Sequence, residues 1–404
     1  MRDLLKKGAT LIVLGTGGVG KTTIAASLGV VAARAGLKTA VITVDPSRRL
    51  RDALGLDHLG GRPTALGARR LAAAGLDPSL QFFAMVLDVK GAWDALIERF
   101  TTDSALRERI LNNPFYRQLT SQFAGSEAYA ALAQLHDVHS RGDFDLIVVD
   151  TPPAADAFEF LQAPAHLSRL LDSRVARWLF TPYVSAGRLA MRLASGAARF
   201  VVRELERFAG ATVLTSISDF FTAAQQALDG MVDQLNKAEA LLHSGTVSFL
   251  LVTGSEEERL REAGATIEQM KAQRLRLSAI VINRLVDEET WQYLHGSARG
   301  TAPGLDAIAN LRGALGRGLD RHHGLDALVK YLENYRARAY RDIARAGAFA
   351  QALPPGVRLA VTPEVRAGVI GLKQLAGFGR YLEGCEIKPA RLRSVQSWET
   401  GVSL

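Results

Sequence analysis

Short runs of apolar residues alternate along the chain with longer stretches in which apolar positions recur every three or four residues. The runs occupy residues 10–14, 39–44, 146–149, 247–253, 279–282 and 357–361. Each run is almost entirely apolar, as is typical of strands that are covered on both faces. The alternation of strands and helices predicts an α/β fold: a doubly wound, mostly parallel sheet with helices on both faces.

Two of the connections between these runs are too long for ordinary crossovers. Roughly a hundred residues follow the run at 39–44, and a similar number follow the run at 146–149. Both connections have helical periodicity, with one extended piece expected at 81–88 and a helix at 220–242. We therefore predict a single domain over residues 1–404, with insertions at 60–140 and 158–245 that form a helical subdomain. A further helix is expected at 325–353, ended by two prolines.

Composition limits the kind of protein this can be. Hydrophobic residues make up 48% and charged residues 22%, which is typical of a folded soluble protein. No run of about 18 uncharged apolar residues occurs, and the charged residues 1–7 lead directly into a strand. We therefore expect no spanning helix, no signal peptide and a cytoplasmic location. Cys385 is the only cysteine, so one chain can form neither a disulfide nor a thiolate metal cluster. The net charge of +8 only weakly favours anionic partners, and no nucleic acid is expected.

A glycine-rich segment follows the first predicted strand. Residues 15–22, GTGGVGKT, match the phosphate-loop pattern G-x-x-x-x-G-K-[ST] in full, directly between a strand and a helix. Glycines let backbone N–H groups turn inward around phosphate oxygens, and the next helix directs its positive end toward them. We expect Lys21 to reach the β- and γ-phosphates and the Thr22 hydroxyl to join a Mg²⁺ shell. The predicted nucleotide-binding residues of the loop are Gly15, Thr16, Gly17, Gly18, Val19, Gly20, Lys21, Thr22 and Thr23.

Two aspartates end predicted strands. Asp45 follows the run at 39–44, and Asp150 follows the run at 146–149. The carboxyl ends of parallel strands form the edge at which ligands bind in such sheets. Asp150 is therefore expected to hold Mg²⁺, through a water molecule, beside the phosphate loop.

Several segments together resemble the ArsA-like ATPases, the family of arsenite-pump and tail-anchored-protein-targeting ATPases. The resemblance runs over nearly the whole chain and is strongest for a bacterial branch described as anion-transporting ATPases. It rests on the loop at 15–23, DPSRRL at 45–50, AMVLD at 84–88, DTPP at 150–153, LQAP at 161–164 and VINR at 281–284.

The resemblance implies a dimeric ATPase that uses ATP and Mg²⁺. Asp45 corresponds to the switch I aspartate that activates the attacking water, and residues 150–153 correspond to switch II. Asn283 corresponds to the asparagine that hydrogen-bonds adenine, and Pro363 lies in the loop that covers this base. Residues 236–239, NKAE, are similar to the GTP-specific signal Asn-Lys-x-Asp, but they fall within a helical pattern. Specificity for GTP is therefore not favoured.

The chain departs from the family pattern at the second residue of the loop. Family loops have a lysine there that reaches the nucleotide of the partner subunit, but this chain has Thr16. Hydrolysis is therefore expected to be slow, or to depend on a lysine from a paralogous partner, or on another cation such as Arg48 or Arg49. The expected assembly is a homodimer or a heterodimer with a paralogue. The single cysteine also argues against the family's zinc and arsenite sites.

An arginine stripe lies in the second predicted insertion, and its role stays open. The arginines at 188, 192, 199, 203 and 207 fall on one side of a predicted helix, opposite apolar residues. This helix either presents a surface for a hydrophobic client, an acidic partner or an anionic membrane, or packs within the subdomain with its arginines in solvent. His136 and His139 have metal-binding spacing, but without a third ligand a structural role is favoured.

Two functions remain open on the sequence. The first is a slow ATPase whose cycle controls binding of a partner or client. The second is a nucleotide-binding regulatory or scaffold subunit that scarcely hydrolyses ATP. A partitioning ATPase would share the loop but usually lacks such large insertions.

Overall fold

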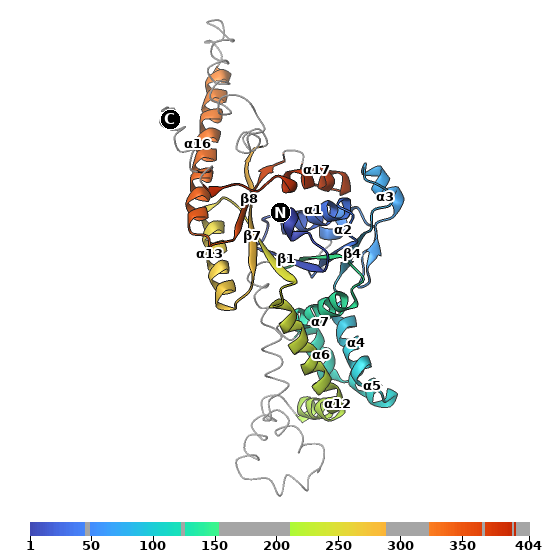
Figure 1. Ribbon diagram of the computed structural model, residues 1–404. Helices are drawn as coiled ribbons and strands as arrows, with labels where there is room; N and C mark the ends of the chain where they lie inside the picture. The colour runs from blue at the N-terminus through green and yellow to red at the C-terminus, as the bar shows by residue number, and fades with distance from the viewer. Residues whose placement is uncertain are drawn as a thin grey trace, which may run out of the picture.

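The computed structural model describes residues 1–44, 49–122, 126–152, 211–287, 323–365, 368–389 and 392. These residues form an eight-stranded sheet with the order β3-β4-β2-β5-β1-β6-β7-β8 (Figure 1). Every neighbouring pair is parallel except β3 and β4. The predicted α/β, mostly parallel fold is confirmed. The strands are β1 (Ala9–Gly15), β2 (Thr39–Thr43), β3 (Thr64–Ala65), β4 (Phe82–Val86), β5 (Leu146–Asp150), β6 (Val247–Thr253), β7 (Leu277–Asp287) and β8 (Arg358–Glu364).

All six predicted apolar runs form strands. Every residue of β1, β2 and β5 is buried, which explains why these strands are apolar on both faces. The extended piece expected at 81–88 is β4, which pairs with β2 and so belongs to the central sheet. The range 60–140, expected as a helical insertion, thus also contributes β3 and β4 to the sheet. The boundaries of the two insertions stay a prediction.

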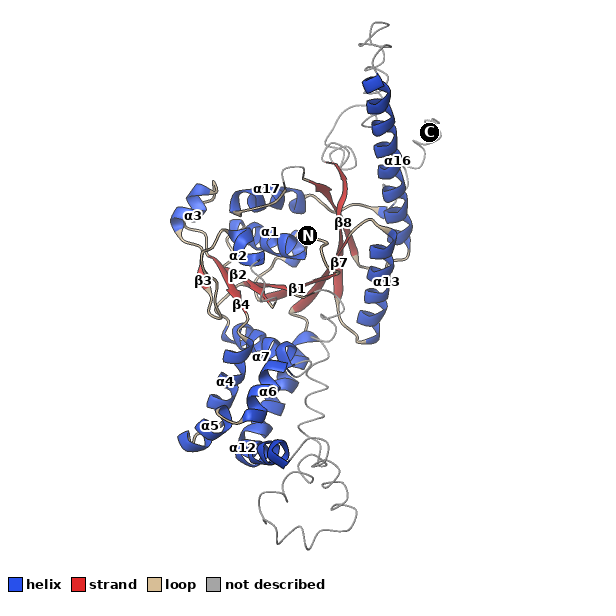
Figure 2. Cartoon of the chain, turned by 180° about the vertical axis from the view of Figure 1, so that it is seen from behind, coloured by secondary structure: helices blue, strands red, loops and turns tan. Residues whose placement is uncertain are grey.

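Helices cover both sides of this sheet. In Figures 1 and 2, α1, α2 and α17 lie on one side, and α7 lies on the other with α4, α6 and α12 beyond it. Helices α13 and α16 pack beside β6 and β7. The helices are η1 (Arg2–Leu4), α1 (Lys21–Arg34), α2 (Arg49–Leu54), α3 (Ala68–Ala73), α4 (Val89–Phe100), α5 (Ser104–Leu111), α6 (Pro114–Gln122), α7 (Ser126–Arg141), α12 (Ala211–Leu242), α13 (Glu257–Ala272), α16 (His323–Gln351) and α17 (Leu372–Glu383).

Helix α1 is buried on most of its surface because the sheet covers one side and α17 covers another. Small residues make this double packing possible. At Gly29 of α1, a Cβ atom would lie only 2.3 Å from Cγ2 of Val41 in β2. At Gly379 of α17, a Cβ atom would lie 2.8 Å from Cγ2 of Val31 in α1. The helix that begins at the phosphate loop is therefore held tightly on two sides.

The helical bundle of α4, α5, α6, α7 and α12 has an aromatic centre. The ring of Phe220 in α12 lies 5.4 Å from that of Phe115 and 6.1 Å from that of Tyr116, both in α6. The Tyr116 hydroxyl donates to Asp94 of α4 at 2.9 Å. Burial is the main reason that the pKa of Tyr116 lies far above its usual value, so the phenol stays neutral and can donate this bond.

The two histidines of α7 serve this packing, as predicted. Nδ1 of His139 lies 3.0 Å from the Thr10 hydroxyl of β1, and Nδ1 of His136 lies 3.0 Å from the Gln234 amide of α12. Burial lowers the pKa of both imidazoles, which favours their neutral forms. Within the described residues, no group of three metal-ligating side chains occurs. The described helices also include none with both the length and the apolar character needed to cross a lipid bilayer.

Candidate functional site

The glycine-rich loop joins the end of β1 to the start of α1. Gly20, directly before α1, has a φ of 92°, in the left-handed region that favours glycine. A Cβ atom at Gly20 would lie 2.4 Å from Nδ2 of Asn283, so glycine is required here for space as well. The Lys21 ammonium donates to the Thr16 carbonyl at 2.8 Å, which holds the lysine over the loop. The loop therefore has the form of a phosphate cradle.

Oxygen-bearing side chains from three elements meet beside the loop. The Thr22 hydroxyl of α1 donates to Oδ2 of Asp150 at 2.7 Å, and the Thr43 hydroxyl of β2 donates to the same oxygen at 3.3 Å. Asp150, at the end of β5, is only 2% exposed. Hydroxyl and carboxylate oxygens are the ligands that Mg²⁺ takes in proteins. The residues thus fit a magnesium site, in which Thr22 and Asp150 would hold the ion.

Thr16 turns its side chain into the protein. The residue is 8% exposed, and its hydroxyl has no hydrogen-bond partner among the described residues. Its backbone carbonyl, in contrast, accepts the bond from Lys21. Position 16 therefore contributes a carbonyl but no charge to the loop.

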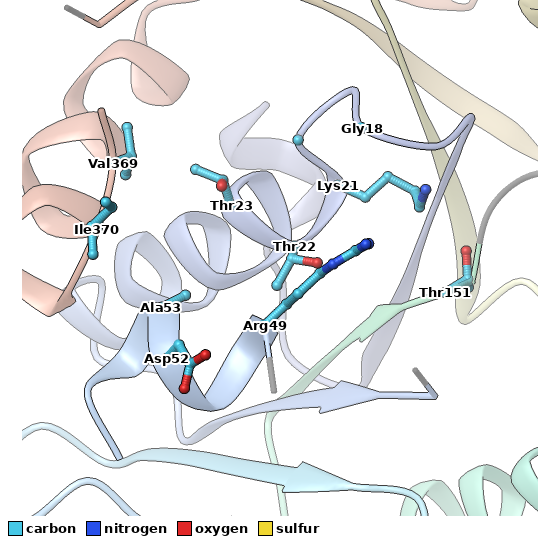
Figure 3. A pocket seen from close by; sticks show the side chains of 11 residues that line it. Gly18, Lys21, Thr22, Thr23, Arg49, Asp52, Ala53, Thr151, Val369 and Ile370 are labelled. Atoms are coloured by element: carbon cyan, nitrogen blue, oxygen red, sulfur yellow. The ribbon is translucent and has the colours of Figure 1, made fainter. Parts of the chain in front are cut away.

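A pocket of about 420 Å³ opens in front of the loop. Figure 3 shows the Arg49 side chain extending from α2 past Thr22, toward the space between Lys21 and Thr151. Asp45 and Arg48, both considered on the sequence, lie outside the described residues, as do Pro153 and the arginine stripe at 188–207. The pocket is lined by Gly18, Gly20, Lys21, Thr22, Thr23, Arg49, Asp52, Ala53, Thr151, Val369 and Ile370.

A second pocket, of about 330 Å³, adjoins the first. The two share Thr23, Val369 and Ile370 in their walls. The sequence singled out Asn283 and Pro363, and both line the second pocket, although their contact with a base stays a prediction. The remaining lining residues are Arg284, Glu364, Val365, Gly368 and Phe378. One continuous site thus has a compartment beside the phosphate loop and a second, partly apolar compartment beside Asn283.

Asn283 links the two compartments. Its Nδ2 donates to the Val19 carbonyl of the loop at 2.7 Å, and the Thr362 hydroxyl of β8 donates to its Oδ1 at 2.6 Å. The side chain is buried, with 6% exposure. Sequence reasoning missed this contact with the loop and also missed Thr43. It placed Thr362 in the segment expected to cover the base, but did not predict its bond to Asn283.

Replacing Asn283 by alanine should therefore loosen the phosphate loop. The variant leaves the Val19 carbonyl and the Thr362 hydroxyl without their partner, so we expect a loss of about 2–3 kcal/mol in the free energy of unfolding and weaker ATP binding. Urea denaturation and calorimetry measure the two effects. Thr362→Val removes only one of the bonds and should cost about 1 kcal/mol. Equal stability of wild type and Asn283→Ala would contradict the linking role.

Comparison with known proteins identifies the family. A profile of the family described as anion-transporting ATPase matches residues 9–300. The chain belongs to this family. The resemblance inferred from the loop and strand-end motifs is thereby confirmed.

The similarity to individual relatives is moderate. An "ATPase ASNA1 homolog 2" of Paramecium tetraurelia is 28% identical over 166 residues, which are 41% of this chain and 47% of the relative. A putative arsenical pump-driving ATPase of Prosthecochloris vibrioformis is 23% identical over 68% of this chain and 60% of its own length. An uncharacterized protein of Streptomyces coelicolor is 30% identical over 70% of this chain and 63% of its own length. The chain spans about half the length of the Paramecium relative.

Proposed function

We propose that this family member is a Mg²⁺-dependent ATPase in which the bound nucleotide acts as a conformational switch. The observation that supports this most directly is the contact between Thr22 and Asp150 beside the glycine-rich loop. It brings together a hydroxyl and a carboxylate suited to Mg²⁺ at the place where the loop would hold phosphates. ATP would lie with its triphosphate against Lys21 and its base beside Asn283 and Pro363. When bound, Mg²⁺ supplies positive charge that stabilises the phosphate oxygens.

Hydrolysis requires a water molecule in line with the leaving ADP. The water oxygen forms a bond to the γ-phosphorus, while the bond from that phosphorus to the bridging oxygen breaks and its electron pair stays on ADP. One proton of the water passes to the Asp45 carboxylate, in the role that the family resemblance assigns to it, and later leaves to solvent. Lys21 and the backbone N–H groups of the loop hold the phosphates in place during this step.

The rate of this step should be low. Thr16 is buried and carries no charge, so a homodimer would lack the lysine that reaches the partner's nucleotide in the family pattern. A cation supplied in this way is worth on the order of 10³-fold or more in phosphoryl transfer. ATP binding does not depend on that charge, because the loop, Lys21 and Thr22 are all present. The proposed oligomeric state is a homodimer or a heterodimer with a paralogue.

The switch would act on a partner or a hydrophobic or membrane client through the segment that follows Asp150 to Pro153. Its arginine stripe, between Arg188 and Arg207, combines a basic side with an apolar side. A nucleotide shifts the exposure of such a surface only if it binds the two conformational states with different affinity.

The alternative to this switch is a regulatory or scaffold subunit that binds ATP without hydrolysing it and pairs with a lysine-bearing paralogue. Thr16 is the residue that favours this alternative.

Turnover by the purified full chain separates the two functions. We expect slow hydrolysis by the wild type, no hydrolysis but intact ATP binding in Asp45→Asn, and a gain on the order of 10³-fold in Thr16→Lys. Phosphate release measures the rates, and calorimetry measures binding. Wild-type turnover no higher than that of Asp45→Asn would favour the regulatory alternative. Brisk wild-type turnover that Thr16→Lys leaves unchanged would show that another residue supplies the charge.

A further inference from the structure

We propose that Arg49 contacts the γ-phosphate of ATP from within the same subunit and stabilises the charge that develops during hydrolysis. This inference rests on the proposed ATPase function and assigns one more residue to its site. It explains how the chain achieves any hydrolysis without a lysine at position 16. The family resemblance left Arg48 and Arg49 as equal candidates. Arg48 lies outside the described residues, and Arg49 lines the pocket.

Arg49 lies on the wall of the loop pocket. Among the described residues that line the loop pocket, Lys21 and Arg49 are the two cations, and they approach from different elements. Lys21 comes from the start of α1 and Arg49 from the start of α2 (Figure 3). The Arg49 side chain extends past Thr22 toward Thr151, which directly follows Asp150. The Thr22–Asp150 contact marks the end of the pocket where Mg²⁺ and the γ-phosphate belong.

The charge of a bound triphosphate calls for a second cation in the pocket. Lys21 alone would leave most of the triphosphate charge without a cation from the protein. Asp52, which also lines the pocket, adds a further negative charge to its wall. The carboxylate of Asp52 accepts bonds from Nε and Nη2 of Arg51, at 3.0 and 2.8 Å. Arg49, from the same helix, adds a positive charge to the pocket wall.

The guanidinium group of Arg49 has the chemistry to bind a phosphate. Its planar set of N–H donors suits phosphate oxygens, to which it binds through two parallel hydrogen bonds. As the bond to the bridging oxygen breaks, negative charge spreads over the γ-phosphate oxygens and the leaving ADP. Arg49 would donate to these oxygens more strongly in the transition state than in bound ATP. Because Arg49 belongs to the same chain as the loop, this contact needs no second subunit.

The test compares three variants of the full chain: Arg49→Ala, Arg49→Lys and the matched control Arg261→Ala. Arg261 is an exposed arginine of α13 that lines neither pocket. Calorimetry measures ATP and ADP affinity, and single-turnover assays measure hydrolysis. Arg49→Ala should weaken ATP binding about tenfold and leave ADP binding within about threefold. It should slow hydrolysis about 30-fold, roughly the gain that an arginine in cis gives to a P-loop nucleotidase. Arg49→Lys should restore part of the ATP affinity but little of the rate, and Arg261→Ala should match the wild type.

Each result decides the inference. A selective loss of ATP over ADP binding in Arg49→Ala, absent in Arg261→Ala, supports it. Equal losses of affinity for ATP and ADP, or no loss of either, would overturn it. A residue with only a structural role does not contact the γ-phosphate and so does not distinguish ATP from ADP. A wild type that binds ATP but does not hydrolyse it would refute the proposed ATPase function. In that case the ratio of ATP to ADP affinity alone decides whether Arg49 contacts the γ-phosphate.

Discussion

Replacing Lys21 by alanine should lower the affinity for Mg·ATP by at least about a hundredfold. The ammonium group is held over the glycine-rich loop by the Thr16 carbonyl, in a residue that is only 8% exposed. Each charge-assisted hydrogen bond to phosphate contributes about 1.5–3 kcal/mol, and Lys21 is placed to make two of them. Isothermal calorimetry on the full chain measures the affinity.

The matched control for this variant is Lys271→Ala. Lys271 lies on α13, outside both pockets, and its side chain is 73% exposed. Removing it changes the net charge by the same amount but takes no group from the loop. We expect ATP affinity within about twofold of the wild type, because the interactions of exposed charges are weak. Unchanged affinity in Lys21→Ala would show that the loop is not the nucleotide site.

The fold was predictable from the sequence wherever burial on both faces made a strand apolar. All six apolar runs are strands of the sheet, because helices bury both faces of a parallel sheet and its strands are therefore mostly apolar. Strand β3 was not predicted, since its two residues, Thr64 and Ala65, are both exposed. Strand β7 extends to Asp287, five residues beyond the predicted end, because its pairing with β8 resumes at Val286 and Asp287 after a shift of register.

The phosphate loop and Asp150 were predictable because their signals are local: a glycine pattern and an acid at a strand end. The contacts of Thr43 and Thr362 were not, because only the order and register of the strands bring these residues to their partners. Thr43 pairs with Asp150 across β2 and β5. Thr362 follows Val361, the residue that pairs with Ile282, and so lies beside Asn283. Such contacts join residues about 80 to 110 positions apart and leave no pattern in a single sequence.

Asn283 shows a different limit on what a sequence motif predicts. The family resemblance predicts a role toward the base, and the residue does line the second pocket. Its contact with Val19, 264 positions earlier in the chain, is a separate role that the motif does not indicate. A buried amide has two donors and two acceptor positions, so one asparagine is able to hold the loop and also face a ligand.

The loop also depends on packing behind it, and Gly15→Ala should reveal this as a large loss of stability. A Cβ atom at position 15 would lie 2.3 Å from the Val252 carbonyl oxygen and 3.2 Å from Cγ2 of Val19. The carbonyl cannot move away easily, because Val252 is paired with Gly15 within the sheet. Gly15 also has a φ of 154°, which side-chain-bearing residues rarely adopt. Overpacking and backbone strain together should cost about 3 kcal/mol in the free energy of unfolding, measured by urea denaturation.

Gly17→Ala provides a control in the same loop. No heavy atom lies within 4 Å of a Cβ atom built at Gly17, and its φ lies outside the left-handed region. The added methyl group therefore meets open space, and we expect a change in stability below about 0.5 kcal/mol. Equal losses in the two variants would mean that the loop tolerates no side chain for a reason other than its contact with β6. A loss of stability confined to Gly15→Ala would instead show that the steric constraint lies where β1 joins the loop and packs against β6. At this junction the sheet sets the direction in which the loop leaves β1.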